Sequence, residues 1–93
     1  MGVEIRHEAE SQRFVAEVDG AEAVVLYKRP DDGTIDLFRT YTPEALRGRG
    51  IAGRIVEAAL EYARTEGLRV VPTCPYVARF IEKHDEYQGL VAD

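Results

Sequence analysis

The residues best suited to chemistry in this chain form one segment, Arg47-Gly48-Arg49-Gly50-Ile51-Ala52-Gly53, which opens the longest helical pattern. The N-terminus of a helix presents backbone N–H groups without intrahelical partners and carries about half a positive charge, so it favours a bound anion. Glycine lacks the Cβ atom that would hold a phosphate away from these N–H groups. The segment therefore predicts a phosphate-binding turn at the start of the helix.

Cys74 is the second candidate, because Thr73-Cys74-Pro75 is typical of a helix start with proline at the first helical position. A thiolate at a helix N-terminus is stabilised by the helix dipole, which would make this thiol reactive. A lone cysteine can equally be a buried apolar residue without chemistry. Two weaker candidates are Tyr76, which donates a proton or packs its ring in the core, and Thr40, which is otherwise an ordinary strand residue.

Four apolar or alternating segments precede the glycine-rich segment, and they are separated by turn residues. Asp19-Gly20 is a strong turn signal, and Pro30-Asp31-Asp32-Gly33 has the chemistry of another turn. Such a succession predicts an antiparallel meander of four strands joined by short loops. The expected strands span residues 3–7, 14–18, 22–28 and 34–41.

The spacing of apolar residues becomes helical after these strands. Thr42 and Pro43 suit the cap and the first position of a helix. From Ile51 the apolar residues follow one stripe to about Glu66, and Gly67 supplies a C-terminal stop. We therefore expect one central helix over residues 51–66.

A short strand and a last helix are expected after the central helix. Residues 68–71 are rich in valine, and Pro72 either ends this strand or confines it to an edge. The last helix begins at Pro75, and its apolar and aromatic residues at helical spacing are Tyr76, Val77, Phe80, Ile81 and His84. The order of four strands, helix, strand and helix is that of an α+β protein.

Composition limits the partners of the chain. Its 93 residues, 45% of them apolar and 31% charged, predict one soluble domain over residues 1–93. A net charge of −5 argues against binding to duplex nucleic acid. The arginines are nonetheless concentrated at Arg47, Arg49 and Arg54, which suits a small polyanionic ligand. Because no metal-ligand pattern stands out, we expect no metal cofactor.

The same sequence predicts the cellular setting. No apolar run approaches the roughly 20 residues that span a membrane, and the charged start Met1–His7 is unlike an export signal. A single cysteine excludes an internal disulfide, and a lone thiol fits a reducing cytoplasm. We therefore expect a cytoplasmic protein without a membrane partner, while its oligomeric state stays open.

The glycines also match the Gly-x-Gly-x-x-Gly fingerprint of dinucleotide-binding proteins, through Gly48, Gly50 and Gly53. That fingerprint requires a βαβ unit whose second strand ends in an acidic residue about 20 residues further on. Here that strand ends Val70-Val71-Pro72, and four strands precede the glycines. The dinucleotide interpretation is therefore rejected.

Arg47, Gly50 and Ala52 form an Arg-x-x-Gly-x-Ala pattern, preceded by Thr40-Tyr41-Thr42-Pro43-Glu44 and followed by Val71-Pro72-Thr73-Cys74-Pro75-Tyr76-Val77. These stretches resemble the GNAT superfamily of N-acetyltransferases, and among them the small single-domain members that carry a cysteine in a Pro-x-Cys-x-Tyr context. The resemblance implies a GNAT-like α+β fold with an antiparallel four-stranded meander, a central helix, a splayed fifth strand and a C-terminal helix. The acyl-CoA pantetheine arm would lie between the splayed strands.

The resemblance further implies transfer of an acetyl group from acetyl-CoA to an amine acceptor, small or carried by a protein, which the sequence does not identify. Cys74 would be an acyl acceptor or a wall of the site, and the pyrophosphate would lie on the glycine-rich segment. The residues that the resemblance assigns to acetyl-CoA binding are Tyr41, Thr42, Arg47, Gly48, Arg49, Gly50, Ile51, Ala52 and Gly53.

Two departures from family patterns concern proton transfer. Cysteine-containing relatives usually have His-Thr where this chain has Arg39-Thr40, and arginine stays protonated near neutral pH. Larger members often carry a tyrosine acid in the last helix, at the position that Glu82 holds here. A non-catalytic acyl-CoA-binding module or sensor is therefore the alternative to an enzyme.

Overall fold

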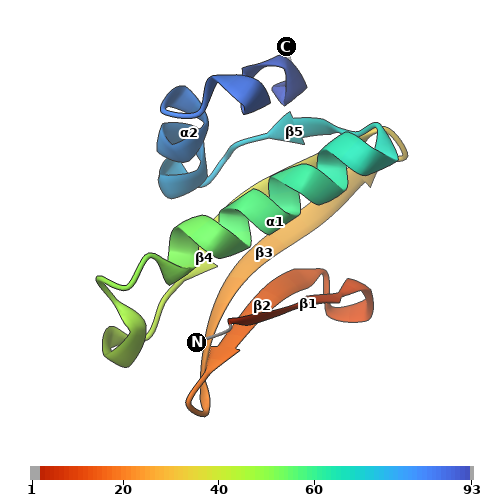
Figure 1. Ribbon diagram of the computed structural model, residues 1–93. Helices are drawn as coiled ribbons and strands as arrows, with labels where there is room; N and C mark the ends of the chain where they lie inside the picture. The colour runs from red at the N-terminus through yellow and green to blue at the C-terminus, as the bar shows by residue number, and fades with distance from the viewer. Residues whose placement is uncertain (1–2, 93) are drawn as a thin grey trace.

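The computed structural model describes residues 3–92, which form one five-stranded sheet with the strands in chain order, β1-β2-β3-β4-β5 (Figure 1). The first four strands pair antiparallel, and β5 pairs parallel with β4. The strands are β1 (Glu4–Glu8), β2 (Arg13–Val18), β3 (Ala21–Asp31), β4 (Thr34–Tyr41) and β5 (Arg69–Val71). The predicted α+β meander is confirmed.

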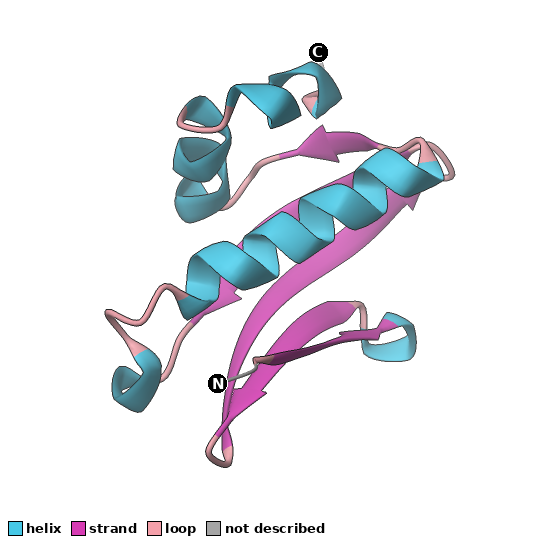
Figure 2. Ribbon diagram, viewed as in Figure 1, coloured by secondary structure: helices cyan, strands magenta, loops and turns pink. Residues whose placement is uncertain are grey.

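One α-helix follows β4 and the other follows β5, as Figure 2 shows. The α-helices are α1 (Ile51–Glu66) and α2 (Pro75–Glu82), and the 3₁₀ helices are η1 (Ala9–Ser11), η2 (Glu44–Leu46) and η3 (Asp85–Leu90). Both predicted α-helices are present, and α1 has the expected bounds. The sequence did not predict η3, after which Val91 pairs with Val70 beside β5.

Two local predictions are corrected by the structure. Strand β3 runs to Asp31 because the turn to β4 needs only Asp32 and Gly33; Pro30 lies where the register with β4 shifts, so pairing is already interrupted there. The helix start suggested by Thr42 and Pro43 is corrected, because Pro43 precedes only the short η2 and α1 begins at Ile51. Only the short η2 forms, without a side-chain cap, because Arg47 is extended and Gly48 and Gly50 are left-handed.

The core lies between the sheet and one face of α1, which crosses in front of β3 and β4 in Figure 1. Val56, Ala59 and Leu60 of α1 are fully buried, as are Val25 of β3 and Leu37 of β4. This apolar stripe fixes the direction of α1 across the sheet. It therefore also fixes where the glycine turn at the start of α1 lies relative to β4.

Strands β4 and β5 separate after a short paired stretch. The pairs are Thr34↔Arg69, Ile35↔Val70 and Asp36↔Val71, and the Cys74 N–H then donates to the Leu37 carbonyl at 3.0 Å. Strand β4 continues to Tyr41, whereas the other chain turns into α2. In the described part of the chain, no strand pairs with residues 38–41 of β4 on that side. The predicted splay of the fifth strand is confirmed.

Candidate functional site

The turn that opens α1 depends on two glycines with left-handed backbone. Gly48 has φ +77° and Gly50, which precedes the first residue of α1, has φ +74°. A Cβ atom at either position would meet nothing within 4 Å, so the glycines are required by the backbone conformation and leave open space beside it. No side chain caps the start of α1. The first N–H groups of α1 therefore have no side-chain acceptor and can receive an anion.

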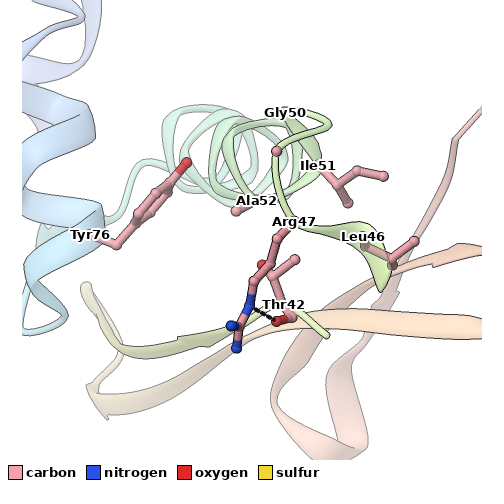
Figure 3. Close-up of a pocket in the computed structure, with 8 residues that line it drawn as sticks. Thr42, Leu46, Arg47, Gly50, Ile51, Ala52 and Tyr76 are labelled. Carbon is pink, nitrogen blue, oxygen red and sulfur yellow. Dashed lines mark hydrogen bonds between the residues drawn. The ribbon is translucent and has the colours of Figure 1, made fainter. Parts of the chain in front are cut away.

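A hollow of about 340 Å³ lies at this turn. Figure 3 shows Tyr76 of α2 on one side of it and Arg47 and Gly50 of the turn on the other. Its lining residues are Thr42, Leu46, Arg47, Gly48, Gly50, Ile51, Ala52 and Tyr76. The hollow therefore combines the start of α1, the residue that follows the unpaired half of β4, the end of η2 and the start of α2.

Arg47 spans the turn and supplies positive charge to the hollow. Its Nε donates to the Thr42 carbonyl at 3.1 Å, the dashed bond in Figure 3, which leaves its terminal nitrogens for a ligand. Among residues 3–92 no carboxylate lies within ion-pair distance of Arg47 or Arg49. Arg47 lines the hollow and Arg49 does not, although both are exposed. The two arginines are therefore not equivalent.

Cys74 lies where β4 and β5 separate. It precedes Pro75 at the N-terminus of α2, as predicted, and its side chain is buried, with 5% exposed. Burial raises the pKa of the thiol. The backbone N–H groups of Val77 and Tyr76 and the Thr40 hydroxyl, 3.6 Å from Sγ, outweigh burial, so the pKa lies below its usual value. In the described chain the Thr40 hydroxyl is the side-chain hydrogen-bond partner of Cys74, and it is not a base.

The structure brings together most, but not all, of the residues singled out from the sequence. Thr42, Arg47, Gly48, Gly50, Ile51 and Ala52 line the hollow. Tyr41, Arg49 and Cys74 lie outside it. Gly53 faces α2 instead: a Cβ at this position would lie 3.5 Å from the Phe80 ring and 3.7 Å from the Tyr76 hydroxyl, in ordinary van der Waals contact with α2.

Two lining residues were missed as site residues. Tyr76 was a weaker candidate, for proton donation or for core packing, and was not predicted to bind the ligand; its side chain is 43% exposed and forms one wall. Leu46 is buried and anchors η2 beneath the turn. The sequence could have indicated this anchor, because Leu46 is an apolar residue directly before a glycine-rich turn that has no apolar side chain of its own to bury.

The parted strands, the glycine turn at the start of α1 and the element order together define an α+β fold of the N-acetyltransferase class. A GCN5-like protein from Staphylococcus aureus, solved by NMR in solution, has the same fold with a TM-score of 0.76 and 26% identity, covering 96% of this chain and 87% of that one. The profile of the GCN5-related N-acetyl-transferase family matches residues 13–90, and the chain belongs to this family.

The chain is also similar to the animal protein called Protein NATD1. The Bos taurus protein is 33% identical over 84 residues, and the match covers 88% of this chain and 74% of the relative. The Danio rerio protein is 33% identical over 88 residues, 92% of this chain and 80% of the relative. The Homo sapiens protein is 31% identical over 84 residues, with coverage of 88% and 74%. These likenesses extend over most of the fold, including the site.

Two further features of residues 3–92 bear on partners. Neither α-helix described is long and apolar enough to cross a membrane. Within the same residues, no three or more His, Cys, Asp or Glu side chains are grouped so that they could hold a metal ion.

Proposed function

We propose that this protein is an acetyl-CoA-dependent N-acetyltransferase that acts on an amine acceptor. The observation that carries the proposal is the hollow at the glycine turn, which adjoins the half of β4 that has no strand partner toward β5. A cavity with free N–H donors beside an open strand edge suits a ligand with a pyrophosphate at one end and amide groups along its arm. Acetyl-CoA has both. In this proposal residues 1–93 act as one acyl-CoA-binding domain, and the lone thiol fits a reducing cytoplasm.

The donor would bind through backbone groups more than side chains. The N–H groups from Arg47 to Gly53 would hold the pyrophosphate, and the Arg47 guanidinium would add charge. The main chain of Tyr41 and Thr42 would bond the pantetheine arm, as a strand added to the open edge of β4. The thioester would then lie near Thr40 and Cys74, where the two strands part.

Transfer requires the amine nitrogen to bond to the acetyl carbon as the bond from that carbon to sulfur breaks. The nitrogen loses a proton and CoA leaves as a thiol or thiolate. Holding the two reactants together and donating hydrogen bonds to the developing oxyanion can supply most of the rate. We favour direct transfer over an acetylated Cys74, because no base among the described residues contacts the thiol and Arg39 is permanently protonated.

The same features support a second candidate, a non-catalytic acyl-CoA-binding module. Such a module needs the hollow and the open edge of β4 but no base. Its specific support is the buried thiol, whose side-chain partner is the Thr40 hydroxyl. Turnover separates the two candidates: release of free CoA in the presence of a panel of amines and peptides supports the enzyme, and binding without release supports the module.

Binding itself is tested by thermal unfolding with acetyl-CoA. At a ligand concentration 100-fold above the dissociation constant, the stabilisation should be about 2.7 kcal/mol. Gly50→Glu should abolish it, because a side chain and a negative charge would occupy the hollow. Gly67→Glu is the matched control, since Gly67 also has a left-handed φ of +70° and open space but lies at the opposite end of α1. A folded Gly50→Glu protein with an unchanged shift contradicts the proposed site.

A further inference from the structure

Arg39 departs from the family pattern, and the proposed function gives it no role. It lies in the half of β4 that has no partner toward β5, and it directly precedes Thr40, near which the thioester would lie. The side chain of Arg39 is exposed. Within residues 3–92 it forms no ion pair. A permanent cation therefore lies beside the proposed reacting atoms.

The pairing of β3 with β4 shows which side of the sheet carries Arg39. Arg39 lies opposite Leu26, and Leu26 alternates with Val25 and Tyr27, whose side chains are buried in the core under α1. Residues directly opposite each other in an antiparallel pair project from the same side of the sheet. Arg39 therefore projects from the side that faces away from α1.

The acceptor amine would approach the thioester from this same side. On the side of α1, packed core residues fill the point where β4 and β5 separate: Leu37 and Val77 are fully buried, and Cys74 is 5% exposed. The pantetheine arm would occupy the gap between the two strands. The open route for an amine is therefore the side away from α1, and this route passes Arg39.

Two other charged groups on this side of the sheet offset one another. The Lys28 ammonium lies 5.0 Å from the centre of the Phe38 ring, and Lys28 is paired with Asp36 across the two strands. Asp36 is half-buried, and its carboxylate accepts a hydrogen bond from the Thr73 hydroxyl at 2.5 Å. In the described part of the chain, Arg39 has no such counterpart. The route is therefore positive next to the gap.

This positive charge selects among amine acceptors. An ammonium group near a fixed cation has a lowered pKa, so more of the acceptor is the neutral amine that attacks the thioester. The same cation repels diamines and basic peptides. An acceptor with a carboxylate close to its amine avoids this repulsion, because the carboxylate can accept two hydrogen bonds from the planar guanidinium.

We propose that the acceptor is an amine with a carboxylate close to it, and that Arg39 binds this carboxylate. The inference rests on the proposed function, since it names the acceptor of the same transfer. The amine nitrogen bonds to the acetyl carbon, the bond from that carbon to sulfur breaks, and the amine proton passes to water or to the departing CoA thiolate. A free amino acid and a peptide that begins with aspartate both have this chemistry.

The release of CoA with two pairs of acceptors tests the inference. The first pair is phenylalanine and phenethylamine, and the second is a peptide that begins with aspartate and the same peptide beginning with asparagine. Rates are compared at equal concentrations of unprotonated amine, because the extra carboxylate changes the ordinary pKa of the amine. In at least one pair, the wild-type kcat/KM should be about tenfold higher for the acceptor with the extra carboxylate.

Variants of Arg39 then show whether this residue causes the preference. Arg39→Gln should reduce the ratio within a pair to about one and leave the KM for acetyl-CoA within about twofold. Arg39→Lys keeps the charge without the planar fork, so it should retain part of the preference. Arg29→Gln is the matched control, because it removes an exposed cation of β3 whose guanidinium donates to the carbonyls of Asp32 and Thr34. The control should leave the ratio unchanged.

The outcomes separate this inference from the function on which it rests. A preference in the first pair assigns free amino acids as acceptors, and a preference in the second pair assigns peptides. Turnover without a preference in either pair overturns the inference and leaves the proposed function standing. A preference that persists in Arg39→Gln also overturns it, because another group would then bind the carboxylate. If no acceptor releases CoA with the wild-type protein, the inference and the proposed function both fail.

Discussion

The Sγ atom of Cys74 lies 3.6 Å from the Oγ1 atom of Thr40, across the point where β4 and β5 separate. Thr40 belongs to the half of β4 without a partner toward β5, and Cys74 begins α2. The contact therefore joins the two sides of the gap through side chains where the backbone pairing has ended. It also gives the thiolate a hydroxyl donor in addition to the N–H groups of α2.

Thr40→Val should raise the pKa of Cys74, because it removes the hydroxyl that stabilises the thiolate and preserves the shape of the side chain. The measurement is thiolate absorbance near 240 nm against pH, as Cys74 is the single cysteine of the chain. Thr34→Val is the control, since Thr34 lies on the same strand and makes no contact with Cys74. An unchanged titration in Thr40→Val would show that the N–H groups of α2 alone set the pKa.

Cys74→Ala should retain acetyl transfer to within about tenfold, because direct transfer relies on positioning and not on this nucleophile. Incubation of the wild-type protein with acetyl-CoA should leave no acetyl group on Cys74 in mass spectra. Bound CoA should nevertheless protect the thiol from iodoacetamide, whose access is already limited by burial. Capture of an acetylated Cys74 that discharges to an amine at the rate of turnover would reverse this assignment.

Arg47→Ala should weaken CoA binding and lower its dependence on salt, because the guanidinium lines the hollow beside the proposed pyrophosphate. The loss should be a few-fold, matching at most about 1 kcal/mol for an exposed charge pair. Arg49→Ala is the control, since Arg49 is exposed but does not line the hollow. The measurement is the affinity for CoA at low and at high salt. If Arg47→Ala and Arg49→Ala change this affinity and its salt dependence equally, the two arginines are equivalent and the prediction is wrong.

The sequence predicted regular elements better than the surface between them. Helix α1 has its predicted bounds because an uninterrupted apolar stripe specifies its buried face and Gly67 ends it with left-handed backbone. The expected helix start at Thr42 failed, because local capping preferences do not report that Arg47 is extended and that Gly48 and Gly50 are left-handed. The sequence left open whether Tyr76 packs in the core, since helical spacing gives only the direction of a side chain.

The part of the site that is formed by backbone groups could be predicted from the sequence. The residue type alone indicates a left-handed turn at Gly48 and Gly50, because few other residues adopt this conformation without strain. The partnership of Tyr76 with the turn arises from the packing of α2 on α1 at Gly53, a tertiary contact between segments far apart in the chain. No local pattern in the sequence encodes that contact.

His7 makes a separate prediction, for the pH dependence of stability. Its ring stacks on Phe14 with centroids 4.2 Å apart, meets the edge of Tyr62, and places Nε2 2.6 Å from the Tyr27 hydroxyl. Burial lowers the pKa of His7 below its ordinary value of 6.5, because the charged imidazolium loses solvent in this aromatic cluster. The folded protein therefore holds His7 neutral at pH values where the unfolded chain protonates it.

The sign of the effect follows from this difference in bound protons. Above pH 6.5 His7 is neutral in both states, and its contribution to the free energy of unfolding is fully present. As the pH falls below 6.5, the unfolded state binds the proton first and stability declines.

His7→Phe keeps an aromatic ring against Phe14 and cannot titrate, so stability should lose its slope just below pH 6.5. The decline at lower pH should remain, because Arg13 lowers the pKa of Glu8 below 4.5 and that ion pair is lost there. Urea unfolding at pH 8, 7, 6 and 5 measures both variants, and an equal slope between pH 7 and 5 in His7→Phe would show that another group titrates in this range.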